Sequence, residues 1–245
     1  MKQIKQEKIL VIPDVHLKAW MFDRALEIME REKIEQAVCL GDLVDDFDQE
    51  MNTGAYEGIF NKILDFDEAH PNTLWCYGNH DISYLWGKLE SGYSPYQEQR
   101  VIQNVRILRD KFQDRLAFAH SIGKCLFTHA GVTWDFLDNL RYRGFKVRGI
   151  RSIEDVRDMV NQCGEKELWN DDSSLWVRPL NCSPSKLFNE YGVLQVTGHT
   201  PVRKSYQNGS ILFCDTFSTY ADGTPYGDQS FQIVTSDGQW LGSVK

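Results

Sequence analysis

Aspartate, histidine and asparagine side chains recur in this sequence directly after short apolar runs. Asp14 and His16 follow the run 9–12, and Asp42 follows the run 37–40 and one glycine. Three later runs end in the same way, at Asn79, His129 and His199. Carboxylate, imidazole and amide groups together suit divalent cations such as Mn²⁺, Fe²⁺ or Zn²⁺. We therefore predict that these six residues form a metal site.

A single carboxylate can bridge two cations, and Asp42 is the candidate bridge. Two ions about 3.5–4 Å apart can share a water, ionise it near neutral pH and clamp a phosphoryl group. Taken alone, these residues also have structural explanations. Asn79 would be a turn residue, and His129 would be a hydrogen-bonded histidine of the core. Because five separate segments follow one plan, the metal interpretation is favoured. His70 and His120 do not follow that plan, and we assign them no role.

Composition limits the classes of partner. The formal net charge of −8 argues against duplex nucleic acid as the main partner, because affinity for the phosphate backbone comes from Lys and Arg. Four of the six cysteines lie in apolar runs, namely Cys39, Cys76, Cys125 and Cys214. Buried thiols without pairing favour a reducing, cytoplasmic location. No apolar run is long enough to cross a bilayer, so we expect no membrane partner.

The elements that must position these residues alternate in the first half of the chain. Apolar runs predict buried strands at 9–12, 37–40 and 73–77, and helical spacing appears at 23–33 and 59–66. The acidic stretch 45–58 is expected to be a loop over the site. Ser94, Pro95 and Gln97 indicate a capping box that opens a helix with an apolar stripe.

The second half is rich in strands. The runs 116–120 and 124–129 predict a hairpin, and further strands are expected at 193–197, 210–214, 230–235 and 239–244. The stretch 134–180 is interpreted as a cap-like insertion beside the site. We expect one α/β domain over 1–245, with two packed mixed β-sheets flanked by helices.

Five motifs resemble the signature of the calcineurin-like metallophosphoesterases. They are Asp14-Val15-His16, Gly41-Asp42-Leu43-Val44-Asp45, Gly78-Asn79-His80-Asp81, His129-Ala130-Gly131 and Gly198-His199-Thr200-Pro201. The motifs occur in the family's order and span residues 14 to about 216. Within the family the chain is most similar to the bacterial and phage branch. That branch holds Ser/Thr protein phosphatases, PrpE-like diadenosine tetraphosphatases and the phosphatase module of polynucleotide kinase-phosphatases.

The resemblance implies a four-layer fold and a dinuclear metal centre. The implied ligands are Asp14 and His16 for one ion, Asn79, His129 and His199 for the other, and Asp42 for both. The ions would be Mn²⁺, with Fe or Zn as alternatives. His80 would protonate the leaving oxygen, Asp45 would orient His80, and Asn79 would contact the substrate beside it. A histidine is suited to this task near neutral pH.

The chain departs from the family pattern after Asp45. The family continues with Arg and Gly, whereas this chain continues with Asp46 and Phe47. The missing Arg normally grips the phosphate, and Asp46 would repel it. We hypothesise that Arg178 supplies the phosphate contact instead. The alternative is that Arg178 is a surface residue next to a core tryptophan.

The leading hypothesis is a phosphomonoesterase that resembles Ser/Thr phosphoprotein phosphatases, with hydroxide on the metal pair as nucleophile. Diadenosine tetraphosphate is the second candidate substrate. RNA ends that carry a 2′,3′-cyclic phosphate or a 3′-phosphate are the third. A non-catalytic scaffold for a protein partner would be marked by lost ligands, and here every motif residue from Asp14 to His199 is present.

Overall fold

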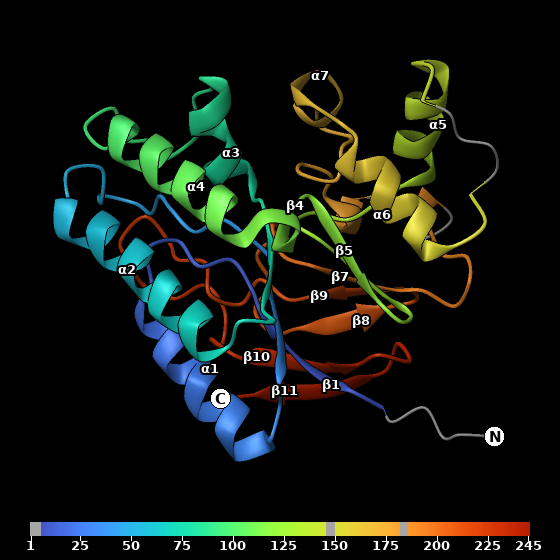
Figure 1. The fold of residues 1–245 in the computed structure, drawn as a ribbon, viewed down its shortest axis with the longest axis horizontal. Helices are drawn as coiled ribbons and strands as arrows, with labels where there is room; N and C mark the ends of the chain where they lie inside the picture. The colour runs from blue at the N-terminus through green and yellow to red at the C-terminus, as the bar shows by residue number, and fades with distance from the viewer. Residues whose placement is uncertain (1–5, 146–149, 182–185) are drawn as a thin grey trace.

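Two mixed β-sheets form the centre of the computed structural model, which describes residues 6–145, 150–181 and 186–245. The first sheet has the order β11-β10-β1-β2-β3-β4, and the second has the order β5-β6-β7-β9-β8 (Figure 1). The strands are β1 (Lys8–Ile12), β2 (Gln36–Cys39), β3 (Leu74–Cys76), β4 (Leu116–Ala117), β5 (Ala119–Ile122), β6 (Cys125–Thr128), β7 (Leu194–Thr197), β8 (Tyr206–Asn208), β9 (Ile211–Phe213), β10 (Phe231–Thr235) and β11 (Trp240–Val244). In both sheets, parallel and antiparallel pairs occur together.

The position of strand β1 explains why residues 9–12 are all apolar. Successive side chains of a strand point to opposite faces of the sheet. Ile9 and Val11 pack with Phe127 in the cluster between the sheets. Leu10 and Ile12 belong to the cluster under the helices. Because both faces of the sheet are covered, every residue from Ile9 to Ile12 is buried.

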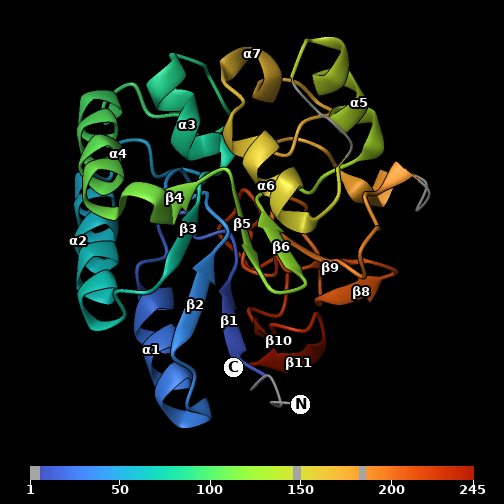
Figure 2. The ribbon, with the colours of Figure 1, turned by 45° about the vertical axis from the view of Figure 1, so that its right-hand side comes forward.

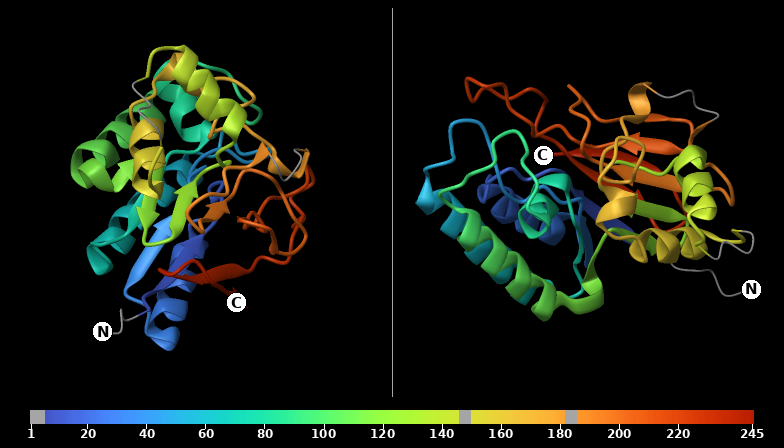
Figure 3. Two further views of the ribbon diagram at one scale, coloured as in Figure 1. Left: turned by 90° about the vertical axis from the view of Figure 1, so that its right-hand side faces the viewer. Right: turned by 90° about the horizontal axis from the view of Figure 1, so that it is seen from above.

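Helices cover the outer faces of both sheets. They are α1 (Trp20–Glu32), α2 (Thr53–Ala69), α3 (Asn79–Trp86), α4 (Glu98–Phe112), α5 (Trp134–Tyr142), α6 (Ile153–Asn161) and α7 (Glu165–Leu168), with 3₁₀ turns at Gln113–Arg115 and Pro179–Asn181. Helices α1 and α4 contact β1 and β4 of the first sheet, while α6 contacts β5 and β6 of the second. In Figure 2, α1, α2 and α4 lie at the left, beside β1, β2 and β3, and α5, α6 and α7 lie at the upper centre and right, beside β5 and β6; Figure 3 gives two further views. The predicted arrangement of two mixed sheets between helices is confirmed.

Two predicted boundaries are wrong for reasons of tertiary structure. The run 116–120 is not one strand, because β4 pairs with β3 in the first sheet and β5 pairs with β6 in the second. The chain thus crosses between sheets at Phe118. The predicted loop 45–58 ends at Asn52, whose side chain accepts a hydrogen bond from the Ala55 amide and caps α2. Tyr56 is therefore a helix residue.

The predicted capping box at Ser94 forms only in part. The Ser94 hydroxyl accepts the Gln97 amide at 3.1 Å, but the Gln97 side chain donates to Thr53 at 2.9 Å instead of returning. The Ser94 amide donates to the hydroxyl of Tyr84 at 2.8 Å. Helix α4 begins at Glu98, and its predicted apolar stripe is buried at Val101, Val105, Leu108 and Phe112.

The four cysteines predicted to be buried are unpaired, buried thiols, and so is Cys163. Cys182 lies outside the described residues. Among the helices of the described ranges, none is long and apolar enough to span a membrane.

His120 is a buried residue of strand β5. Its Nε2 donates to the Trp75 carbonyl at 2.9 Å. Burial lowers the pKa of His120 to about 4, whereas an unfolded histidine has a pKa of about 6.5. The unfolded chain therefore binds more protons between these two values. His120 stabilises the fold fully above the unfolded pKa, and this contribution is lost as the pH falls through the window.

We expect the difference between the folded and unfolded pKa of His120 to make the free energy of unfolding depend on pH. Between about pH 7.5 and about pH 5, the protein should lose about 2 kcal/mol more stability than the variant His120→Gln. Urea unfolding at the two pH values measures both chains under the same conditions. An equal pH dependence in both chains would show that His120 does not titrate as described.

Candidate metal centre

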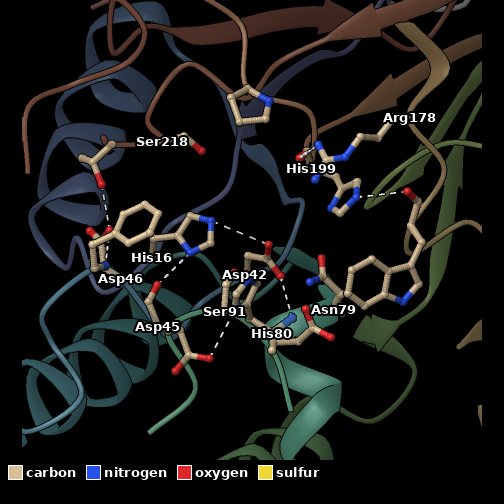
Figure 4. Close-up of a pocket in the computed structure, with 16 residues that line it drawn as sticks. His16, Asp42, Asp45, Asp46, Asn79, His80, Ser91, Arg178, His199 and Ser218 are labelled. Carbon is tan, nitrogen blue, oxygen red and sulfur yellow. Dashed lines mark hydrogen bonds and ion pairs between the residues drawn. The ribbon is translucent and has the colours of Figure 1, made fainter. Parts of the chain in front are cut away.

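The predicted ligands meet where parallel strands of both sheets end. Strands β1, β2 and β3 run parallel in one sheet, as do β6 and β7 in the other. Their carboxyl ends lead directly to the predicted metal ligands. Of these, His16, Asp42, Asn79 and His199 line a cavity of about 370 Å³ (Figure 4). Asp14 and His129 are buried against them, so the structure brings all six residues together.

Asp42 lies at the centre of this cluster. Its Oδ2 is 3.7 Å from His16 Nε2 and 3.3 Å from His129 Nε2. Its Oδ1 accepts the backbone N–H of His80 at 3.0 Å. Burial raises the pKa of Asp42, but His129, His80 and His16 outweigh this and hold the pKa well below its usual range. Asp42 is therefore an ionised carboxylate with almost no access to water.

Asp14 provides an independent test of whether a cation fits. Its Oδ2 accepts the His199 N–H at 2.8 Å. Its Oδ1 is buried and has no hydrogen-bond partner among the described residues. Burial, together with the charges of Asp215 and Asp42, raises the pKa of Asp14 well above its usual range. A cation beside Asp14 would satisfy the orphaned oxygen and favour its ionised form.

Three histidines are oriented by backbone carbonyls. The bonds join His16 Nδ1 to Asp45 O at 2.8 Å, His129 Nδ1 to Leu40 O at 2.9 Å and His199 Nε2 to Trp176 O at 3.1 Å. In each ring, the nitrogen facing the carbonyl must carry the proton. In the neutral form of each ring, the opposite nitrogen keeps its lone pair, which is how metal-binding histidines are commonly held.

The ligand atoms fall into two groups that share Asp42. Atoms of His16, Asp42 and His80 lie within 4.8 Å of one another, and so do atoms of Asp42, His129 and His199. Two divalent cations that share a carboxylate fit this donor set. His80 rather than Asp14 accompanies His16 in the first group, so the role of Asp14 as a ligand stays a prediction.

The backbone at the site is unusually constrained. Four of its residues have φ in the left-handed region, at 44° for His16, 48° for Asp42, 63° for Asp45 and 59° for His199. Residues other than glycine rarely adopt this conformation. Gly78 lets the next loop approach closely, since a Cβ there would lie 2.1 Å from Asp42 Oδ1. The site is held by tight turns that its neighbours must enforce.

His80 occupies the first turn of α3 beside Asp45. Its Nδ1 is 3.1 Å from Asp45 Oδ2. Burial lowers the pKa of His80, but the charge of Asp42 and the hydrogen bond to Asp45 outweigh this and raise the pKa to about 9. Sequence reasoning missed Tyr56 and Tyr84, whose hydroxyls donate to Asp45 Oδ1 at 2.7 and 2.6 Å. The spacing of four residues from His80 to Tyr84 on one helix was the available signal.

Asp46 is an ion-paired carboxylate at the edge of the cavity. Its carboxylate accepts Lys18 Nζ at 2.7 Å and Thr219 Oγ1 at 2.7 Å. Burial raises the pKa of Asp46, but Lys18 and Thr219 outweigh this and lower it. The Lys18 ammonium offsets part of the charge of Asp46, and the repulsion of a phosphate by Asp46 stays a prediction. The hydrogen bond from Thr219 to Asp46 also ties the loop after β9 to the loop after β2.

Arg178 lines the same cavity, next to Trp176. Its Nη1 donates to the His199 carbonyl at 3.0 Å, and its side chain is exposed (Figure 4). Its position supports the hypothesis that it contacts a phosphate, and the contact itself stays a prediction.

Comparisons with known proteins agree with this architecture. Residues 7–214 match the family described as calcineurin-like phosphoesterase. No curated protein is similar enough to count as a relative. A solved structure of a cold-active protein tyrosine phosphatase is similar with a TM-score of 0.58 and 15% identity, over 96% of this chain and 78% of that one. The E. coli phosphoesterase Yfce aligns with a TM-score of 0.41 and 14% identity, over 97% of this chain and 98% of that one.

The close approach at Gly78 gives a direct test of the site's geometry. We expect Gly78→Ala to weaken Mn²⁺ affinity by about tenfold or more, because the new Cβ displaces Asp42. Gly58→Ala is the matched control, since a Cβ at Gly58 in helix α2 meets nothing within 4 Å. Calorimetric titration with Mn²⁺ measures both variants. Equal Mn²⁺ affinity in the two variants would contradict the described packing.

Proposed function

Because the chain belongs to the calcineurin-like phosphoesterase family, we propose that its metal-dependent hydrolysis acts on phosphomonoesters, with Ser/Thr phosphoproteins as the first substrate class. One observation carries this proposal. A single cavity is lined by Asp42, His80 and Arg178, which combine a candidate metal ligand, a proton donor and a cation for the phosphate. These three groups together would bind a phosphoryl group and give a proton to its leaving oxygen.

The metal ligands are assigned as the sequence predicted. Asp14 and His16 would hold one divalent ion, Asn79, His129 and His199 the other, and Asp42 both. Mn²⁺ is the proposed metal, with Fe or Zn as alternatives. Bound there, the ions would supply a nucleophile derived from water and neutralise charge on the phosphoryl group.

The chain's own side chains supply the rest of the proposed chemistry. With Nδ1–H donated to Asp45, His80 presents Nε2–H to the leaving oxygen and transfers that proton as the P–O bond breaks. Asp45 holds the imidazole in this orientation. The Arg178 guanidinium would bind phosphate oxygens in its planar fork. Asn79 would contact the phosphoryl group beside His80.

The remaining assignments concern the whole chain. We propose a single domain over 1–245, in which the cap-like insertion 134–180 contributes Trp176 and Arg178 to the cavity. A cytoplasmic location is supported by the buried, unpaired thiols.

A substrate panel with Mn²⁺ tests the proposed class. It compares a phosphoserine peptide and p-nitrophenyl phosphate with bis-p-nitrophenyl phosphate, diadenosine tetraphosphate and RNA with a 2′,3′-cyclic phosphate end. We expect kcat/KM to be highest for the monoesters. His80→Asn should lower kcat on the phosphoserine peptide by about 100-fold. A higher kcat/KM on a diester or a dinucleotide would overturn the monoester proposal, and no turnover of any substrate would favour a scaffold.

The same assay tests Arg178. We expect Arg178→Ala to lower kcat/KM on the phosphoserine peptide by about 10- to 100-fold, the loss of a charge-assisted contact. Arg141→Ala is the matched control, because Arg141 is an exposed arginine of α5 that pairs with Asp138. If both variants retain full kcat/KM, Arg178 is not the phosphate contact.

A further inference from the structure

Each carboxylate oxygen of Asp45 has a separate set of partners. Oδ2 faces His80 Nδ1 at 3.1 Å, and Oδ1 accepts the hydroxyls of Tyr56 and Tyr84 at 2.7 and 2.6 Å. The Asp45 side chain is 0% exposed, so water does not compete for these positions. Because Oδ1 is occupied by two donors, only Oδ2 is available to the imidazole.

The two tyrosines reach Asp45 from different helices. Tyr56 lies in α2 and Tyr84 in α3, and both side chains are fully buried. Burial and the Asp45 charge raise the pKa of both hydroxyls above their usual value, so both stay protonated and donate. The Tyr84 hydroxyl also accepts the Ser94 N–H at 2.8 Å, which fixes its direction.

We propose that Tyr56 and Tyr84 are positioning residues, which lock the plane of the Asp45 carboxylate and through it aim His80 at the leaving oxygen. This inference rests on the proposed function, in which His80 is the proton donor. In the step concerned, an oxygen derived from water would bond to phosphorus as the P–O bond to the leaving group breaks. The electron pair of the broken bond stays on the leaving oxygen, and that oxygen takes the His80 Nε2 proton. The imidazole is left neutral, while Asp45 stays ionised and both tyrosines keep their protons.

A purely structural reading gives a different expectation. Two hydroxyls that merely satisfy a buried carboxylate would affect folding and all substrates alike. Positioning of a proton donor matters only when the leaving group needs the proton. An alkoxide leaving group, as in a phosphoserine peptide, needs it far more than p-nitrophenolate does.

Tyr56→Phe is the decisive variant, because it keeps the ring and removes the hydroxyl that donates to Asp45 Oδ1 at 2.7 Å. We expect kcat on the phosphoserine peptide to fall by about tenfold with little change in KM, and kcat on p-nitrophenyl phosphate to change by less than about twofold. Tyr84→Phe should act in the same direction and also lower the Tm, since it leaves the buried Ser94 N–H without its acceptor.

Tyr93→Phe is the matched control. The ring of Tyr93 stacks on Tyr84 at 4.4 Å between centroids, but its hydroxyl donates to Glu98 instead of Asp45. We expect this variant to retain both activities. Equal losses on the two substrates in Tyr56→Phe, or no loss on either, would overturn the positioning role.

The variant His80→Asn in the same assay distinguishes the role of His80 as proton donor from the positioning role of the two tyrosines. If it slows the phosphoserine peptide far more than p-nitrophenyl phosphate and Tyr56→Phe does not, only the tyrosine inference fails. If it slows both substrates equally, His80 is not the proton donor and the tyrosine inference fails with it.

Discussion

The burial of the Asp42 carboxylate is the constraint on which the rest of the structure depends. Only 2% of this residue is exposed, and a buried charge costs several kcal/mol unless it is compensated. His16 and His129 face one oxygen, and the His80 N–H binds the other. Nearby Asp14 adds a second buried carboxylate with an orphaned oxygen. The chain therefore places two carboxylates close together, where bound divalent ions would offset the free-energy cost of burying their charge.

The concentration of buried charged side chains at the site accounts for the unusual backbone conformations there. Loops that follow neighbouring strands of the first sheet approach so closely that glycine is required, as at Gly41, where a Cβ would lie 2.4 Å from the Gly78 nitrogen. The same crowding places Asp42 and His199 in the left-handed region of φ. Strain of this kind persists only where the surroundings enforce it. The close-packed sheets supply that support through the apolar cluster between them.

The sequence predicted the parts of the fold that depend on neighbouring residues. Apolar runs identified the strands, and Asp14, Asp42 and His129 were recognisable because each follows such a run. The parts that were missed depend on contacts between distant segments. Asp46 meets Thr219 across 173 positions, and Tyr56 meets Asp45 only because α2 starts earlier than its apolar spacing indicates. No local pattern carries that information, so substrate contacts are harder to predict than metal ligands.

Asp42 is the proposed shared ligand of two ions, and metal stoichiometry tests this role most directly. Protein purified without chelator and loaded with Mn²⁺ should bind about two ions per chain, and Asp42→Asn should lose both, because each group of ligands contains this carboxylate. Elemental analysis of the two chains after removal of unbound metal provides the measurement. One ion or none in the unmodified chain, or two ions retained by Asp42→Asn, would contradict the bridging role of Asp42.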